Sequence, residues 1–377
     1  MENEDTQELN VTEIMHELDR RQDQFLEDLK SYLSYAVEHR ASDLFIVAGG
    51  PVSVKIDGRI SAVGDGKVLP PQTEGLITQI YRLAGRSMSG YQSRGDDDFS
   101  FALPGLARFR VNTYRQRGSM AAVVRVVSFE IPDWQKLHIP EQVMDLANVT
   151  HGMVLVTGTA GSGKSTTQAC IINRINQTRN CHIITLEDPI EFLHRDQMSI
   201  VSQREIAIDT NDYLSALRAC LRQAPDVILL GEMRDHETIR TAMTAAETGH
   251  LLIAPLHTKG TVNTIDRIID SFPPAQQDQI RIQLSTVLHT VVSQQLLPDK
   301  NGGLVPAYEV MHMNSAIRNL IRDSKNHQID NAIATGRTEG MISMDQSILD
   351  LYHAGYITQE TALSYADNPD QLRRRMG

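Results

Sequence analysis

The sequence has few cysteines and no long apolar stretch. Its three cysteines, Cys170, Cys181 and Cys220, are scattered over 377 residues without a C-x-x-C pair, so neither a disulfide framework nor a zinc ribbon is expected. No uninterrupted apolar run approaches the roughly 20 residues that a membrane-spanning helix needs, and the acidic N-terminus differs from a secretory signal. We therefore expect a protein of the reducing cytoplasm with no direct membrane insertion.

Basic residues are also fewer than acidic residues. The 36 Lys and Arg residues face 47 Asp and Glu residues, which gives a formal net charge of -11. Such a balance argues against a general nucleic-acid-binding surface, so no nucleic acid is expected as partner. The hydrophobic content of 41% is ordinary for a globular protein, and the length allows two domains.

A phosphate-binding loop is the strongest local pattern. The apolar run from Met153 to Val156 leads into the sequence G-T-A-G-S-G-K-S, and a helical stretch follows it. Glycines allow backbone N–H groups to approach phosphate oxygens, Lys164 brings a positive charge, and Ser165 offers a hydroxyl to Mg²⁺. The alternative is a flexible Gly/Ser loop. We predict that ATP is bound by Gly158, Ala160, Gly161, Ser162, Gly163, Lys164, Ser165 and Thr166.

Three later strand-like runs end in polar residues. The first carries Glu187, Asp188 and Glu191, the second ends at Glu232, and the third precedes His257. In open α/β sheets, ligands bind where strands end, so these side chains are candidates for a magnesium shell or for positioning a water molecule. Taken alone, the carboxylates also suit a helix N-cap or a solvated loop, and the histidine also suits a structural role.

Two domains are predicted from the order of the elements. A helix over 25–37 and short strands near 44–47, 52–56, 59–63, 98–102, 107–112 and 120–127 indicate a compact α+β domain. From His151, strands near 154–157, 182–186, 227–230 and 251–254 alternate with helices, which predicts a mostly parallel, RecA-like sheet. Beyond Phe272 we expect mainly helices, with one strand near 305–311.

The predicted boundaries follow from these patterns. We expect an acidic extension over 1–24, the α+β domain over 25–131, a linker over 132–150, the ATPase domain over 151–312 and a helical region over 313–377. Arginines are frequent near the end of the first domain, where Arg110 and Arg125 lie on strands. They form either a solvated basic face or a group that reaches the γ-phosphate of a nucleotide in the second domain.

Four motifs in this order resemble the secretion-type ATPases of type IV pili and type II secretion, and in particular their PilT-like retraction branch. Residues 158–166 resemble the family's Walker A loop, 187–192 its Asp box, 230–235 its Walker B segment and 248–258 its His box. The stretch 316–323, A-I-R-N-L-I-R-D, resembles a signature of the retraction branch. The four-cysteine metal site usual in the assembly ATPases is missing from the sequence. Thr159-Ala160 stands where the family usually has Pro-Thr.

The resemblance implies a fold and roles for individual residues. The fold is a RecA-like P-loop ATPase domain preceded by a smaller PAS-like α+β domain, with a helical C-terminal region. Glu232 would activate water, Glu191 would serve Mg²⁺ or its water network, and His257 would sense the phosphate state. Arg110 and Arg125 would reach the nucleotide from the first domain.

The resemblance also implies an assembly and a task. The chain would form a homohexamer that hydrolyses ATP, hinges at its linker, and docks peripherally on an inner-membrane pilus platform protein to drive pilus retraction and twitching motility. Three alternatives stay open: a pilus assembly or type II secretion ATPase, a non-hydrolysing nucleotide-dependent regulator of the pilus machine, and a nucleic-acid translocase.

Overall fold

The computed structural model describes residues 2–56, 58–64, 66–127 and 130–376, and for residues 2–19 it describes the backbone only. The chain divides into two compact units, Met1–Phe129 and Glu130–Gly377, which are treated separately below. No helix within the described ranges is both long and apolar enough to cross a membrane.

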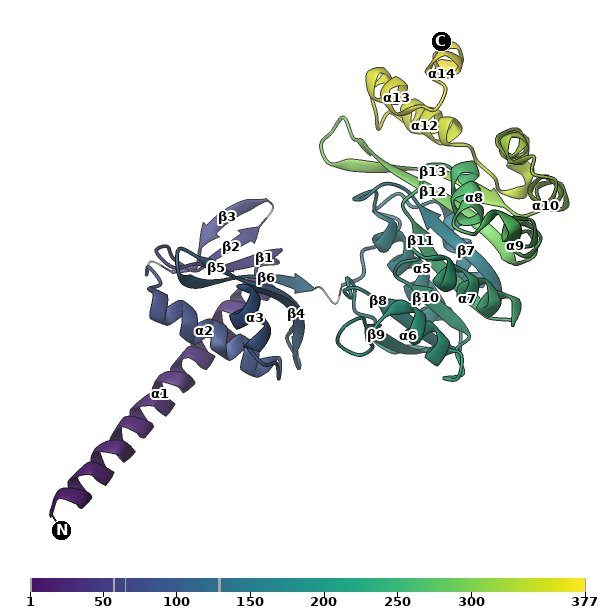
Figure 1. Ribbon diagram of the computed structural model, residues 1–377. Coiled ribbons are helices and arrows are strands. Elements are labelled where there is room, and N and C mark those ends of the chain that lie inside the picture. The colour runs from purple at the N-terminus through teal and green to yellow at the C-terminus, as the bar shows by residue number, and fades with distance from the viewer. Residues whose placement is uncertain (1, 57, 65, 128–129, 377) are drawn as a thin grey trace. The chain divides into compact units, whose positions relative to one another are not determined.

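The first unit is built on a six-stranded antiparallel sheet with the order β3-β2-β1-β6-β5-β4 (Figure 1). The sequence of β5 has the alternation typical of a sheet with one buried face. Its buried residues, Ala107, Phe109, Val111 and Thr113, alternate with more exposed ones. The strands are β1 (Asp43–Ile46), β2 (Ser53–Ile56), β3 (Arg59–Ala62), β4 (Asp96–Leu103), β5 (Ala107–Gln116) and β6 (Ser119–Val127).

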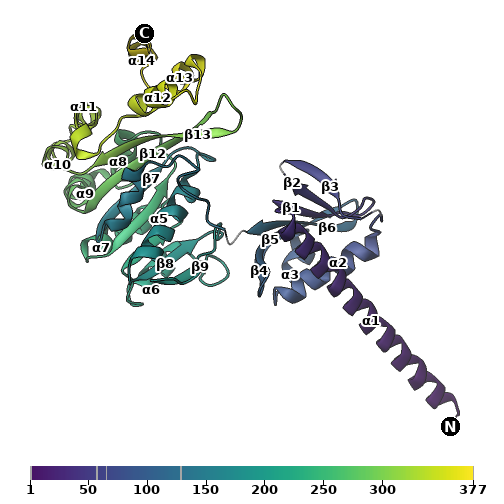
Figure 2. The same ribbon diagram turned by 180° about the vertical axis from the view of Figure 1, so that it is seen from behind.

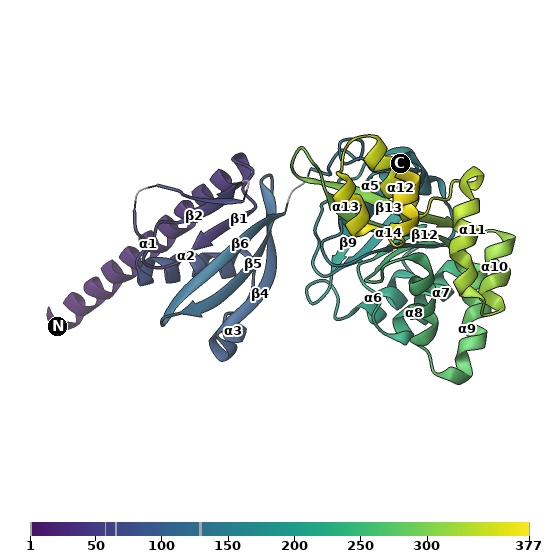
Figure 3. The ribbon, with the colours of Figure 1, turned by 90° about the horizontal axis from the view of Figure 1, so that it is seen from above.

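Three helices accompany this sheet: α1 (Glu2–Glu38), α2 (Pro70–Leu83) and α3 (Ser89–Arg94). Leu29, Leu33 and Ala36 of α1 are buried in the same core as Ile77 and Ile80 of α2. Helix α1 is longer than the helix predicted over 25–37, because the backbone of residues 2–24 continues it without a break. In Figures 1 and 3 the N-terminal part of α1 runs away from the body of its unit.

The second unit contains a seven-stranded sheet with the order β13-β12-β7-β11-β10-β8-β9. All of its pairings are parallel except β12–β13, so the prediction of a mostly parallel sheet is confirmed. The strands are β7 (Gly152–Thr157), β8 (His182–Glu187), β9 (Ile200–Glu205), β10 (Val227–Leu230), β11 (Leu251–Leu256), β12 (Leu288–Pro298) and β13 (Leu304–His312).

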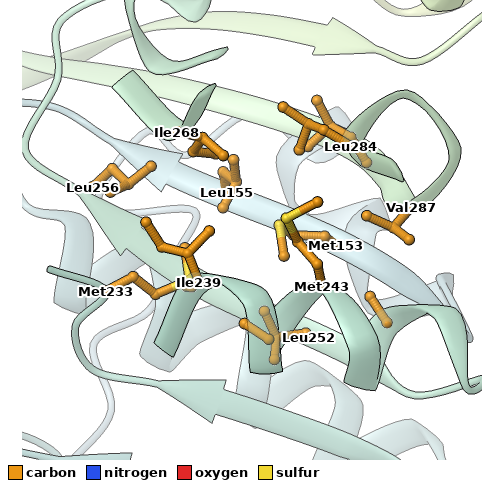
Figure 4. Close-up of a cluster of buried hydrophobic side chains, with 14 of the residues drawn as sticks. Met153, Leu155, Met233, Ile239, Met243, Leu252, Leu256, Ile268, Leu284 and Val287 are labelled. Carbon is orange, nitrogen blue, oxygen red and sulfur yellow. The ribbon is translucent and has the colours of Figure 1, made fainter. Parts of the chain in front are cut away.

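Helices cover both faces of this sheet. They are α5 (Lys164–Thr178), α6 (Tyr213–Cys220), α7 (His236–Glu247), α8 (Thr261–Asp270) and α9 (Pro274–Val287). Figure 4 shows one face of the core, where Met153 and Leu155 of β7 meet Met243 of α7 and Leu284 of α9. Because β7 lies inside the sheet and is buried along its whole length, the loop that follows it starts from a fixed point.

Strand β12 was not predicted, and the expectation of mainly helical structure beyond Phe272 was wrong there. Helix α9 passes into β12 at Leu288 without a connecting loop, so the sequence offers no turn signal. Five consecutive residues of β12, Thr290 to Gln294, are buried, which removes the alternation that marks a half-exposed strand. Strand β9 was also missed.

The predicted linker packs closely on the second unit. Ile139, Val143 and Met144 are buried in a core cluster of that unit, together with α4 (Glu141–Met144) and η1 (Asp145–Asn148). Arg179 Nη1 donates to the carbonyls of Ala147 at 3.0 Å and Val149 at 2.7 Å. Residues 130–149 are therefore part of the second unit.

The C-terminal region is helical, as predicted. Its elements are α10 (Ser315–Arg322), η2 (Asn326–Gln328), α11 (Ile329–Thr335), η3 (Arg337–Glu339), α12 (Met344–His353), α13 (Gln359–Tyr365) and α14 (Pro369–Met376). Figure 2 shows α12, α13 and α14 beside the β12–β13 hairpin. A cluster of apolar side chains joins them, with Leu297 and Val305 of the hairpin against Ile348 and Leu372.

Candidate active site

The phosphate-binding loop connects β7 to α5. Gly158, Gly161 and Gly163 have φ values of 144°, 76° and 86°, which side-chain-bearing residues rarely adopt. Lys164 Nζ donates to the carbonyls of Gly158 at 2.9 Å and Thr159 at 2.8 Å, so the lysine lies along its own loop. Burial lowers the pKa of Lys164, and the nearby negative charge of Glu191 opposes that shift.

Gln294 of β12 supports the loop from behind. A Cβ on Gly158 would lie 2.3 Å from the carbonyl oxygen of Gln294, and one on Gly163 would lie 2.8 Å from its Nε2. Thr167 Oγ1 donates to Gln294 Oε1 at 2.8 Å. The loop therefore requires glycine for close packing against β12 as well as for its dihedral angles. Sequence reasoning missed Gln294, because β12 itself was not predicted.

A cavity of about 310 Å³ joins this loop to the ends of three strands. The residues predicted from the sequence that line it are Ala160, Gly161, Lys164, Ser165, Glu187, Asp188, Glu191, Glu232 and His257. The described fold thus brings together side chains that are almost 100 residues apart in the sequence. The hydroxyl of Ser165 and the carboxylate of Glu191 are hard oxygen donors, which suits Mg²⁺ held together with phosphates.

Glu232 lies just after β10 at this edge of the sheet. Its carboxylate pairs with Arg234 Nε, and His257 Nε2 lies 3.9 Å from Glu232 Oε1. The pairing with Glu232 raises the pKa of Arg234 above its ordinary value. A carboxylate in this position can orient a water molecule or accept its proton.

His257 follows β11, which contains Pro255. The proline is accommodated because the β10–β11 pairing ends at Ile253, while the pairing with β7 continues through Pro255 and Val156. His257 itself is exposed at the cavity, with 60% of its side chain accessible. It is therefore available to contact a bound phosphate.

The carboxylates at the end of β8 differ in their surroundings: Glu187 is the last residue of the strand, and Glu191 lies in the loop after it. Glu191 is exposed and lines the cavity. Glu187 accepts a hydrogen bond from Thr185 Oγ1 at 2.6 Å, and burial raises the pKa of its carboxyl group above the ordinary value. Only Glu191 of the two is thus free to reach a ligand without losing a buried hydrogen bond.

Arg110 and Arg125 lie in the first unit and are not part of the cavity in the second. They face each other across the β5–β6 pairing. Arg110 Nη2 pairs with Asp98 at 3.2 Å, and Arg125 Nε pairs with Asp43 at 3.0 Å. Their approach to the nucleotide remains a prediction.

A second hollow of about 180 Å³ flanks the phosphate-binding loop on the side of Thr166. Its lining is mainly apolar and includes Ile139, Leu296 and Leu304. An apolar hollow beside a phosphate loop has the chemistry that an adenine ring requires. Gly163 and Thr166 of the phosphate-binding loop also line it, but its apolar residues come from the linker segment and from β12–β13, where no local motif marks them.

Comparisons with known proteins show similarity over most of the chain. Residues 19–362 match the family model described as "Type II/IV secretion system protein". The chain is 41% identical over 349 residues to the "Type IV pilus retractation ATPase PilT" of Pseudomonas aeruginosa, which covers 92% of this chain and 100% of that protein. It is 42% identical to a "Twitching motility protein" of Neisseria gonorrhoeae, with 85% of each chain covered.

A solved structure of the pilus retraction motor PilT with bound ADP is similar in fold. The TM-score is 0.83 at 45% identity, and the match covers 93% of this chain and 98% of that one. The predicted likeness to the retraction ATPases and the predicted fold class are thereby confirmed. This chain belongs to the type II/IV secretion system protein family.

Proposed function

We propose that this chain is an ATPase motor that drives retraction of a type IV pilus and so twitching motility. The observation that carries the proposal is the convergence of the phosphate-binding loop, Glu191, Glu232 and His257 on one cavity, in a chain similar over almost its full length to a retraction ATPase. Both relatives named above carry pilus retraction or twitching motility in their names.

In the proposed reaction, the loop residues 158–166 hold the phosphates of ATP. Lys164 turns from its own loop carbonyls toward the outer phosphates. Ser165 and Glu191 would hold Mg²⁺, which would supply positive charge to the phosphate oxygens. Glu232 orients the attacking water, and His257 registers whether the γ-phosphate is present.

The proposed working unit is a homohexamer. Arg110 and Arg125 of the first unit reach the nucleotide, and hydrolysis changes the angle between the units. The hexamer acts in the cytoplasm, bound peripherally to the inner face of the membrane through a platform protein of the pilus machine.

Steady-state ATP hydrolysis tests the site. Lys164→Ala should lose ATP binding and turnover, whereas Glu232→Gln should bind ATP and turn over at least about 100-fold more slowly. Wild-type turnover in either variant would overturn the assignment. Binding without hydrolysis in the wild-type chain would point to a regulator of the machine instead.

Pilus phenotypes test the direction of work. A strain without this gene should keep or gain surface pili while losing twitching motility. Loss of all pili would identify an assembly motor, and loss of secretion alone would identify a secretion ATPase. Hydrolysis that requires DNA would point to a translocase.

A further inference from the structure

The loop that carries Glu191 has no regular structure of its own. It runs from Asp188 to Ser199 between β8 and β9 and contains neither helix nor strand. An exposed carboxylate on such a loop could adopt many positions, yet work on a phosphate site requires one. The hydrogen bonds that hold this loop are therefore informative.

Side chains of β9 fix the loop on both sides of Glu191. Before it, the backbone N–H of Ile190 donates to Glu205 Oε2 at 3.2 Å. After it, Gln203 Nε2 donates to the carbonyl of Phe192 at 2.9 Å, and Gln203 Oε1 accepts from the N–H of His194 at 2.8 Å. Gln203 and Glu205 are two residues apart and so share one face of the strand.

Gln203 also connects the loop to the buried end of β8. Its Nε2 lies 3.2 Å from Glu187 Oε1, and Gln203 is paired in register with Thr185, the residue that donates to the same carboxylate. The side-chain amide of Gln203 thus bonds three partners: its Nε2 donates to Phe192 and Glu187, and its Oε1 accepts from His194. A glutamate would have no donor for Phe192 or Glu187, and an apolar residue would satisfy none of them.

We propose that Gln203 is a positioning residue for ATP hydrolysis, which holds the 188–194 loop so that Glu191 faces the phosphate-binding loop. Glu191 and Lys164 line the same cavity, so the loop already presents Glu191 to the phosphate-binding loop. Gln203 itself does not line the cavity, so its effect on the reaction passes through Glu191. This inference rests on the proposed role of Glu191.

The test compares Gln203→Met, which keeps the side-chain length without hydrogen bonds, with Ser202→Ala on the opposite face of the same strand. Ser202 Oγ bonds His182 Nε2 at 2.9 Å and touches neither the loop nor the cavity. We expect Q203M to lower kcat by about 10- to 100-fold with KM for ATP within about twofold of wild type. S202A should retain the wild-type kcat. Gln203→Asn, which keeps the amide but shortens the side chain by one methylene group, replaces Q203M if that variant does not fold.

A double-mutant cycle separates positioning from general support of the fold. If Gln203 acts through Glu191, the variant E191Q/Q203M should be no slower than E191Q alone. Wild-type kcat in Q203M, or losses that multiply in the double variant, would overturn the inference. Wild-type kcat in E191Q would instead remove the proposed role of Glu191, a result that is distinct from the outcome for Gln203.

Discussion

Gly158 is the residue where one added carbon atom should do most damage to the site. Its φ of 144° disfavours any side chain, and its missing Cβ leaves room for the backbone of Gln294. Neither cause can be relieved by a side-chain rotation, because the obstacle is a carbonyl oxygen of a buried strand.

Gly158→Ala should therefore lose nucleotide binding and destabilise the chain by about 1–3 kcal/mol. Titration with a fluorescent ADP analogue and thermal unfolding would measure the two effects. Gly50→Ala is the matched control, since a Cβ there has nothing within 4 Å. Equal behaviour of the two variants would contradict the packing argument.

His194 should make the second unit sensitive to acid. Burial lowers its pKa from 6.5 to about 4, so the folded chain holds it neutral where the unfolded chain takes up a proton. Stability contributed by this residue is complete above about pH 6.5 and falls as the pH drops toward about 4. Between about pH 7 and about pH 5, the loss should be about 2 kcal/mol.

His194→Gln should abolish that part of the pH dependence. Urea unfolding followed by the fluorescence of Trp134 reports on the second unit, because Trp134 is the single tryptophan of the chain and packs against that unit's core. The exposed His327→Gln serves as control and should keep the wild-type profile. An unchanged profile in H194Q would exclude His194 as the cause.

At the residue scale, the sequence predicted those parts of the site that lie in continuous motifs. The phosphate-binding loop, Glu232 and His257 each follow an apolar strand directly, and that proximity can be read from the chain. Gln203 and Gln294 act across strands that are neighbours only once the sheet order is known. The sequence around a polar residue in a strand does not indicate which loop its side chain will hydrogen-bond.

At the scale of secondary-structure elements, the segment 130–149 contains most of the predicted linker, yet several contacts hold it to the second unit. Glu141 pairs with Arg174 at 2.7 Å, Arg174 lies over the ring of Trp134, and Arg179 holds two carbonyls at the end of the segment. We infer that residues 130–149 move with the second unit.

Arg179→Met should loosen the end of that segment. The carbonyls of Ala147 and Val149 lose their donor, at an expected cost of about 1–3 kcal/mol. Hydrogen–deuterium exchange should rise over residues 145–152. Arg222→Met removes one bond at an exposed helix end and should leave this region unchanged. Fast exchange of 130–149 in the wild-type chain would show instead that the segment moves independently.

The elements also show where sequence patterns stop being informative. Alternation predicted the half-exposed strands of the first unit, and apolar runs predicted β7, β8, β10 and β11. Strand β12 satisfies neither pattern, because it is buried on both faces yet contains Ser293 and Gln294, whose partners lie far away in sequence. Tertiary contacts alone make this stretch a strand.

On the scale of the whole molecule, the proposed reaction needs residues from both units. Arg110 and Arg125 are each held by a carboxylate of their own unit, so each must leave that partner to reach a phosphate. The Arg110–Asp98 pair is exposed and contributes little stability, so its exchange for a phosphate costs little free energy. The carboxylate of Asp43 is buried, so the departure of Arg125 costs more.

Arg110→Gln and Arg125→Gln should each lower kcat by about 100-fold or more, because arginine stabilises charge in the transition state. Both variants should keep their affinity for ADP. Folding stability should be unchanged in R110Q and lower in R125Q, because the buried carboxylate of Asp43 then loses its charged partner. Arg59→Gln, on the exposed strand β3, is the matched control. Turnover equal to the control would show that these arginines serve only as a solvated basic face.

The position of β12 has a practical consequence for chimaeric motors. The strand lies between β7, which leads into the phosphate-binding loop, and β13, after which the C-terminal helices follow. An exchange of C-terminal regions between relatives that cuts before β12 would transplant the back wall of the nucleotide pocket as well, including Gln294. A junction after His312 leaves Gln294 and β12 with their own phosphate-binding loop, so such hybrids should keep native catalysis.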